Sequence, residues 1–222
     1  MAESLSHPLI GNITGSLGDG VIQYLGVRYA TIANRLAPPE LVQRYPNGTV
    51  DATKLGPQAI SSPNGCDMEQ SVIQQTLPHS GFDISELEPL HLNITVPQGQ
   101  CGSLPVFVWI HGGGMSSGSN TWPQYDLARF VKLSSDINLP IIAIGLNYRL
   151  GVPGFLSSKT LRERGYKANN GIRDQSVALQ WIQKYIAGFG GDPANVTLAG
   201  ESAGGGKGFQ NSDLPVHGSK KD

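Results

Sequence analysis

The sequence has few cysteines and almost no net charge. Only Cys66 and Cys101 occur among 222 residues, and their spacing matches no zinc or redox motif. One disulfide is possible, and two unpaired thiols are the alternative. The 16 basic and 17 acidic residues give a formal net charge of -1, without a basic stripe or a long run of one sign. This excludes the electrostatic pattern of a nucleic-acid or membrane-surface binder, so nucleic acid is not an expected partner.

Long hydrophobic runs are also lacking. No run approaches the roughly 18 apolar residues of a membrane span, and residues 1–11 lack the basic start and apolar stretch of a signal peptide. The chain as written therefore predicts a cytoplasmic location. Four Asn-x-Ser/Thr triplets would suit a secreted glycoprotein. They are interpreted as chance matches, because Asn93 lies in an expected strand and Asn195 directly precedes another.

Hydrophobic segments alternate in type along the chain. With 39% hydrophobic residues, 222 residues can bury one core, so one domain or part of one is expected. Apolar runs rich in Val, Ile and Leu predict strands, and two stretches with helical periodicity lie between the later runs. The predicted strands are 21–29, 92–96, 104–110, 140–148 and 196–199, and the predicted helices are 124–133 and 171–187. This alternation predicts an α/β fold with a largely parallel central sheet, its later strands buried on both faces. Residues 31–90 are expected to form mainly surface loops.

A serine flanked by small residues follows the last predicted strand. The segment Gly200-Glu201-Ser202-Ala203-Gly204 comes directly after residues 196–199. A nucleophile elbow holds its serine in a strained turn where strand and helix backbones approach closely, so glycine is needed two positions before and after it. Ser202 is therefore the candidate nucleophile.

A glycine-rich turn follows an earlier strand. Residues 104–110 are followed by His111, Gly112, Gly113 and Gly114. Consecutive glycines let backbone N–H groups converge on one point, as an oxyanion hole requires. Each motif alone is weak, since glycine turns are common. Both motifs lie at strand ends and occur in this order. Together they therefore favour an acyl-transfer site over the interpretation as two unrelated glycine turns.

Three segments resemble the type B carboxylesterase family, which contains carboxylesterases, cholinesterases and related lipases. They are VFVWIHGGG (106–114), NYRLGVPGFL (147–156) and the stretch from NNGIRDQ to GESAGG (169–205). The resemblance implies an α/β-hydrolase fold and hydrolysis of small-molecule carboxylic esters. It implies Ser202 as nucleophile and the N–H groups of Gly113, Gly114 and Ala203 as the oxyanion hole. No cofactor and no metal is expected, and the oligomeric state is left open.

The resemblance ends abruptly after Gly205. It divides the chain into residues 1–205, the N-terminal part of such a domain, and residues 206–222, a divergent tail containing Gly and Lys. The family's acid and histidine lie beyond residue 222, so the chain is expected to be C-terminally truncated and nearly inert. A frame shift, a retained intron or a truncated gene model would explain the abrupt end. The alternatives are a non-catalytic, cholinesterase-like interaction module and a fragment without independent function. His217 in the tail is interpreted as a solvated residue.

The sequence differs from the family's usual pattern in two places. The family's usual partner of Cys66 is replaced by Pro89, so that disulfide is expected to be absent. Residues 66–89 contain no tryptophan, and choline esters are therefore not the expected substrate. Glu201 is expected to be a buried support for the site. The other acidic candidates, Asp126, Asp136, Asp174 and Asp192, are assigned structural roles such as helix capping.

Overall fold

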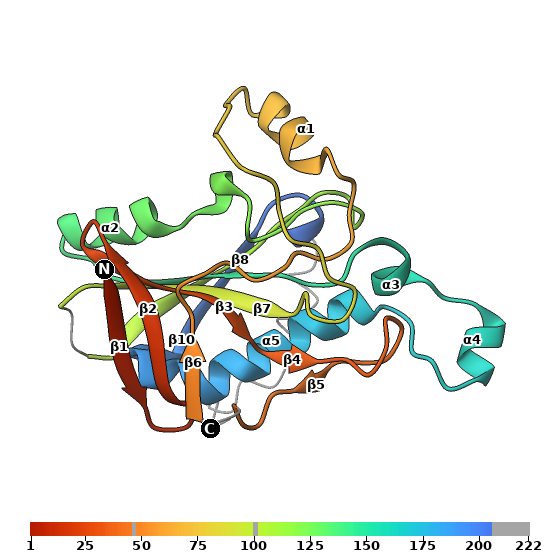
Figure 1. Ribbon diagram of the computed structural model, residues 1–222, viewed down its shortest axis with the longest axis horizontal. Coiled ribbons are helices and arrows are strands. Elements are labelled where there is room, and N and C mark those ends of the chain that lie inside the picture. Colours follow the sequence, from red (N-terminus) through yellow and green to blue (C-terminus); the bar gives the residue numbers. More distant parts are fainter. Residues whose placement is uncertain (46–47, 100–101, 206–222) are drawn as a thin grey trace, which may run out of the picture.

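A mixed eight-stranded sheet with helices on both faces forms the body of the molecule (Figure 1). This computed structural model describes residues 1–45, 48–99 and 102–205. The strand order is β1-β2-β3-β7-β9-β8-β10, with β6 beside β2 and a separate β4-β5 pair. The strands are β1 (Ala2–His7), β2 (Gly11–Gly18), β3 (Val21–Arg28), β4 (Ala30–Thr31), β5 (Glu40–Leu41), β6 (Thr49–Asp51), β7 (His91–Pro97), β8 (Leu104–Ile110), β9 (Ile142–Leu146) and β10 (Gly191–Gly200). The helices are α1 (Gly65–Val72), η2 (Pro123–Tyr125), α2 (Ala128–Asp136), α3 (Gly151–Phe155), α4 (Lys159–Glu163), α5 (Asn170–Tyr185) and η3 (Ile186–Phe189).

The part of the sheet that carries the candidate site is parallel. Strand β8 pairs in parallel with β9 on one side and with β10 on the other, connected through α2 and α5. The remaining main-path strands, from β1 to β7, pair antiparallel, as does β7 with β9. This arrangement confirms the predicted α/β fold. Tight turns explain the antiparallel half: Asp19 and Gly20 both have positive φ between β2 and β3, as a two-residue hairpin turn requires.

Two separate apolar clusters cover the two faces of the sheet. Helix α5 contributes Ala178, Trp181 and Ile182 to the main core, while α2 places Val131 against a smaller cluster containing Ala143 of β9. Figure 1 shows these two helices on opposite sides of the sheet. Every residue of β9 is buried, as predicted for the later strands. The same prediction is wrong for β10, where Thr197 is exposed, because β10 forms the edge of the described sheet.

A buried ion pair attaches α5 to the loop after β9. Arg149 donates from Nη2 to Asp174 Oδ1 at 2.6 Å and from Nε to Oδ2 at 2.9 Å. Arg149 Nη1 also donates to the carbonyl of Ala37 at 2.6 Å, so one guanidinium connects α5 with the loop before β5. Asp174 therefore has the structural role that was predicted, although it acts as an ion-pair partner instead of a cap.

Residues 31–90 are mainly loops, as predicted, but contain the short helix α1 and the strands β4 to β6. Strands β1 and β2, and helices α3 and α4, lie outside the predicted elements. No helix within the described residues is long and apolar enough to cross a membrane.

Candidate active site

Strand β10 ends in a sharp turn that carries Ser202. Strand β10 ends at Gly200, and Ser202 has a φ of 50°, in the left-handed region that side chains other than Gly rarely adopt. Ala203 to Gly205 then adopt helical backbone, with Gly204 N–H donating to Glu201 C=O at 2.8 Å. The serine therefore stands between strand and helix, in the strained conformation that the sequence pattern predicts.

The two glycines beside Ser202 are required by close backbone contacts. A Cβ on Gly200 would come within 2.6 Å of the Gly204 carbonyl carbon, and one on Gly204 within 2.7 Å of the His111 oxygen. Real Cβ atoms essentially never approach other atoms so closely. Gly200 allows the turn to fold back on itself, and Gly204 allows the new helix to pack against the end of β8.

The glycine turn after β8 lies directly against the elbow. Ile110 is the β-partner of Gly200, and its carbonyl accepts a hydrogen bond from Glu201 N–H at 3.3 Å. A Cβ on Gly112 would come within 2.8 Å of the Glu201 backbone oxygen and would also overlap its side-chain carboxylate. The two motifs, separated by about ninety residues in sequence, therefore meet at neighbouring strand ends.

The backbone of the glycine turn presents unpaired donors. Gly113 and Gly114 have φ values of 88° and 60°, and the Gly113 carbonyl accepts from Ser117 N–H at 3.0 Å, which closes the turn. Among the residues that the structure describes, none accepts a hydrogen bond from the N–H groups of Gly113, Gly114 or Ala203. These are the three groups assigned to the oxyanion hole from the sequence.

His111 and Tyr148 support the base of this turn. The two rings stack with centroids 4.5 Å apart, and Tyr148 OH donates to the His111 carbonyl at 2.9 Å. His111 is buried, so it acts as a packed support, and its ring Nδ1 lies 3.1 Å from the Gly112 carbonyl. In the sequence, this histidine is recognisable only as part of the glycine turn.

Glu201 differs from its prediction. It was expected to be a buried support, but it is exposed in the structure. Partial desolvation, and secondly the negative charge of Glu69, raise its pKa. Its carboxylate nevertheless lies beside Gly112. A negative group therefore stands next to the glycine turn.

A polar cluster between α1 and η2 was not found from the sequence. Tyr125 OH donates a short hydrogen bond to Glu69, and Gln124 Nε2 donates to the same carboxylate at 3.4 Å. Cys66 is a free, buried thiol 3.4 Å from Gln70 Nε2, and burial raises its pKa. The two contacts with Glu69 join residues about 55 positions apart, so no local signal could have revealed them.

Each histidine in the described part of the chain contacts a group other than Ser202. His7, His79, His91 and His111 contact the carbonyl of Tyr185, the carboxylate of Asp67, the carbonyl of Pro57 and the carbonyl of Gly112, respectively. His217 lies outside the described residues. Asp126 accepts from Ala128 N–H beside the start of α2, Asp136 pairs with Lys132, and Asp192 accepts from Ala194 N–H. These contacts agree with the structural roles predicted for the three residues, although the N-cap of α2 is Leu127. The described residues also contain no group of His, Cys, Asp and Glu side chains that could hold a metal ion.

Comparisons with known proteins match this geometry to one family. The profile of the carboxylesterase family matches residues 6–207. Lipase 1 of Yarrowia lipolytica is 38% identical over 202 residues, covering 90% of this chain and 39% of that protein. Para-nitrobenzyl esterase of Bacillus subtilis is 35% identical over 208 residues, again covering 90% of this chain and 39% of the relative.

Solved structures give the same result. A para-nitrobenzyl esterase structure superposes with a TM-score of 0.78 at 31% identity, covering 93% of this chain and 40% of the esterase. A thermophilic para-nitrobenzyl esterase gives a TM-score of 0.77 over 92% of this chain. The chain thus spans about 40% of the length of the relatives it matches, including the strand ends that carry the elbow and the glycine turn. On its sequence, its fold and the geometry of these two turns, the chain belongs to the carboxylesterase family.

Proposed function

We propose that this chain carries the nucleophile and the oxyanion-binding backbone of a serine hydrolase that cleaves small carboxylic esters. The observation that carries the proposal is the contact between the elbow, which is strained at Ser202, and the glycine turn, where Gly112 lies against Glu201. Strain at a non-glycine residue is kept where the surrounding structure enforces it, and such positions cluster at catalytic sites. The names of the similar lipases and esterases support the same reaction class.

The reaction assigned to these residues is acyl transfer in two steps. Ser202 Oγ attacks the ester carbonyl carbon while a base takes its proton, and the carbonyl oxygen becomes an oxyanion. The N–H groups of Gly113, Gly114 and Ala203 would stabilise that charge, which is worth about 3–4 kcal/mol for one donor in a comparable hydrolase. The tetrahedral species then expels the alcohol, and water releases the acid from the acyl-serine.

We assign neither the base nor its orienting acid to a described residue. Loss of the histidine from such a triad lowers kcat by about 10⁶. We therefore expect the 222-residue chain alone to hydrolyse p-nitrophenyl esters at a trace rate. A test of Ser202 needs a protein that supplies the two partners.

A chimaera provides that test. Residues 6–205 of this chain would replace the matching portion of the Bacillus subtilis para-nitrobenzyl esterase, whose remaining residues complete the domain. We expect the chimaera to hydrolyse p-nitrophenyl acetate, Ser202→Ala to lower kcat by at least 10⁴, and a fluorophosphonate probe to label the peptide containing Ser202. Ser103→Ala, at an exposed serine, is the matched control and should leave kcat unchanged.

Undiminished hydrolysis in the Ser202→Ala chimaera, or probe label on another serine, contradicts the assignment. If the chimaera does not fold, prolonged labelling of the 222-residue chain followed by peptide mass spectrometry decides between Ser202 and the other serines.

A further inference from the structure

A basic surface lies on the segment between α3 and the first turn of α5. Five of the 16 basic residues of the chain, but only one of its 17 acidic residues, lie within residues 159–173. The exposed basic residues of this segment, here called the α4 surface, are Lys159, Arg162, Arg164, Lys167 and Arg173. Neutral residues separate several of them, and the whole chain is nearly neutral. The exclusion of a membrane-surface binder, which was drawn from the overall charge, therefore does not hold for this segment.

The protein itself compensates little of the positive charge on the α4 surface. The carboxylate of this segment belongs to Glu163, which lies 3.8 Å from Lys159 Nζ in an exposed pair. Exposed pairs of this kind contribute little. Among the residues that the structure describes, Arg164 and Lys167 make no salt bridge. These two side chains therefore present full charges to a partner that approaches the α4 surface.

Hydrogen bonds to neutral groups hold two of the basic side chains in place. Arg162 Nη1 donates to Ser157 Oγ at 2.8 Å, and Arg173 Nε donates to the Ala168 carbonyl at 3.2 Å. The second bond joins α5 to the loop that carries Lys167, so charges from both elements lie on one part of the surface. Because a hydroxyl and a carbonyl carry no net charge, these bonds fix the guanidinium groups without neutralising them.

Exposed apolar side chains accompany the charges. Val152 in α3 is 62% exposed, and Leu156 at the end of α3 is 42% exposed. Met115 is 41% exposed, and its carbonyl accepts from Gly151 N–H at 2.7 Å, which joins the glycine turn to the start of α3. Figure 1 shows α4 at one end of the molecule, farther from the sheet than α3. The end of the molecule that carries the basic residues therefore also carries apolar ones.

The two kinds of side chain together indicate the type of partner. A lipid surface offers anionic headgroups to the Lys and Arg side chains and acyl chains to the apolar ones. An acidic peptide or a nucleic acid could use the charges, but it offers little for Val152 and Leu156 to contact. Each Lys or Arg near an anionic bilayer strengthens binding about fivefold, so a cluster of five gives reversible attachment that weakens with salt.

We propose that the α4 surface docks the chain onto an anionic lipid bilayer, with the five basic side chains at the headgroups and Val152 and Leu156 at the boundary of the acyl chains. The docking is peripheral, because α3 and α4 have 5 residues each and are far too short to cross a bilayer. It does not depend on ester hydrolysis by Ser202, since none of the docking residues belongs to the elbow or to the glycine turn.

Sedimentation with lipid vesicles tests the docking on the 222-residue chain. One preparation is phosphatidylcholine alone, and the other contains about 30% phosphatidylserine, which makes its surface anionic. We expect the partition constant to be at least tenfold higher for the anionic vesicles. It should also fall at least tenfold when NaCl rises from about 0.1 M to about 0.5 M. Equal binding to the two preparations, or no binding to either, overturns the proposal.

Charge variants locate the binding on the α4 surface. Arg164→Gln combined with Lys167→Gln removes two exposed charges that make no salt bridge. We expect this double variant to bind anionic vesicles at least tenfold more weakly, because each charge contributes about fivefold. Lys54→Gln combined with Arg129→Gln removes the same charge from exposed positions elsewhere, and its binding should stay within about twofold of the parent. An equal loss in the two double variants would show a general charge effect and overturn the assignment.

The tail supplies a second control, because it also carries lysines. Lys220 and Lys221 lie outside the described residues, and Lys220→Gln combined with Lys221→Gln removes their charge. We expect the binding of this variant to stay within about twofold of the parent. A tenfold loss would place the lipid contact in the tail and contradict the proposal.

Apolar variants distinguish a lipid surface from an acidic protein. Val152→Ser should lower binding to anionic vesicles at least threefold, because it removes an apolar side chain from the acyl boundary. Leu139→Ser, at an apolar residue that is 67% exposed and lies outside the α4 surface, is the matched control and should leave binding unchanged. Full binding by Val152→Ser, or binding to soluble poly-glutamate without binding to anionic vesicles, would mean that the surface recognises charge alone and would overturn the lipid assignment.

Discussion

Single glycines decide whether the elbow and the glycine turn can meet. Gly204 lies against the carbonyls at the end of β8, where even a methyl group would overlap with backbone atoms. Backbone atoms cannot move aside as the end of a flexible side chain can. The strain at Ser202 is therefore maintained by its neighbours and not by the serine itself.

Gly204→Ala should destabilise the fold by about 1–3 kcal/mol, the usual cost of overpacking. Urea denaturation followed by circular dichroism measures the change. Gly18→Ala is the control, because no atom lies within 4 Å of the added methyl and its φ is not positive. The control should stay within about 0.5 kcal/mol of the parent. Equal effects of the two substitutions would show that the contact with β8 is not tight.

These residue-scale features were the most predictable. The roles of Gly200 and Gly204 follow from a local pattern, because an elbow needs small residues at fixed spacing wherever it occurs. The burial of Glu201 was mispredicted, because burial depends on what surrounds a residue in space.

At the scale of elements, strands with strong apolar character were predicted well and short elements were not. Strand β8 spans the predicted 104–110, and α5 with η3 covers the predicted helix. Strands β1 and β2 were missed because they are polar on one face and rich in Ser, Thr and Gly. The Asp19-Gly20 pair is a hairpin-turn signal in the sequence between β2 and β3. Helix α1 depends on distant partners such as Tyr125, so its sequence alone gives no clear pattern.

The ion pair between the loop after β9 and α5 gives a prediction at this scale. Asp174→Asn leaves the Arg149 guanidinium buried without a countercharge, so it should destabilise the chain by about 3–5 kcal/mol. Denaturant unfolding measures the loss. Asp136→Asn, in the exposed pair with Lys132, makes the same chemical change at the surface and should cost less than about 1 kcal/mol. A small effect of Asp174→Asn would mean that Arg149 finds water or other acceptors.

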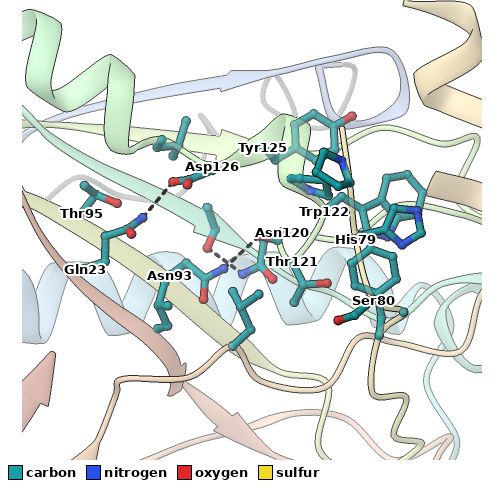
Figure 2. Close-up of a pocket in the computed structure, with 18 residues that line it drawn as sticks. Gln23, His79, Ser80, Asn93, Thr95, Asn120, Thr121, Trp122, Tyr125 and Asp126 are labelled. Atoms are coloured by element: carbon teal, nitrogen blue, oxygen red, sulfur yellow. Dashed lines mark hydrogen bonds between the residues drawn. The ribbon is translucent and has the colours of Figure 1, made fainter. Parts of the chain in front are cut away.

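For the whole molecule, the sequence predicted the fold class and the meeting of two motifs, but not the pocket of about 330 Å³ that Figure 2 shows. The two motifs follow adjacent parallel strands, and strand order in an α/β sheet brings such ends together. The pocket instead gathers Gln23, His79, Asn93, Trp122 and Gly145 from five separate segments. None of these residues belongs to a motif that indicates a shared site, so only the folded chain shows that they lie together.

Global stability should fall in mild acid because of His91. Burial lowers the pKa of His91 from 6.5 to about 4, and its Nδ1 has no partner within the described residues. The folded state therefore keeps His91 neutral while the unfolded state binds a proton below pH 6.5. Stability is full above pH 6.5 and declines as the pH falls toward 4, by about 3 kcal/mol in total. Burial also lowers the pKa of His7, so its contribution has the same sign.

Urea unfolding at pH 7.0, 5.5 and 4.5 measures this loss in the parent and in His91→Gln, which can still donate to the Pro57 carbonyl. The variant should be less stable at pH 7.0 but should lose less stability on acidification. Parallel pH profiles for the two proteins would assign the acid sensitivity to other groups.

The parallel pairing of β8 with β10 has a consequence for synthesis on the ribosome. Ile110 cannot pair with its partner Gly200 until the ribosome has added the 90 residues that separate them in the chain. At about 5–20 residues per second, that delay is roughly 5–20 s. During this time β8, with the sequence LPVFVWI, has at least one unpaired edge outside the exit tunnel, and unpaired apolar strands associate readily. The nascent chain therefore passes through an interval in which chaperone binding competes with aggregation, and the length of that interval is set by the order of strands in the sheet.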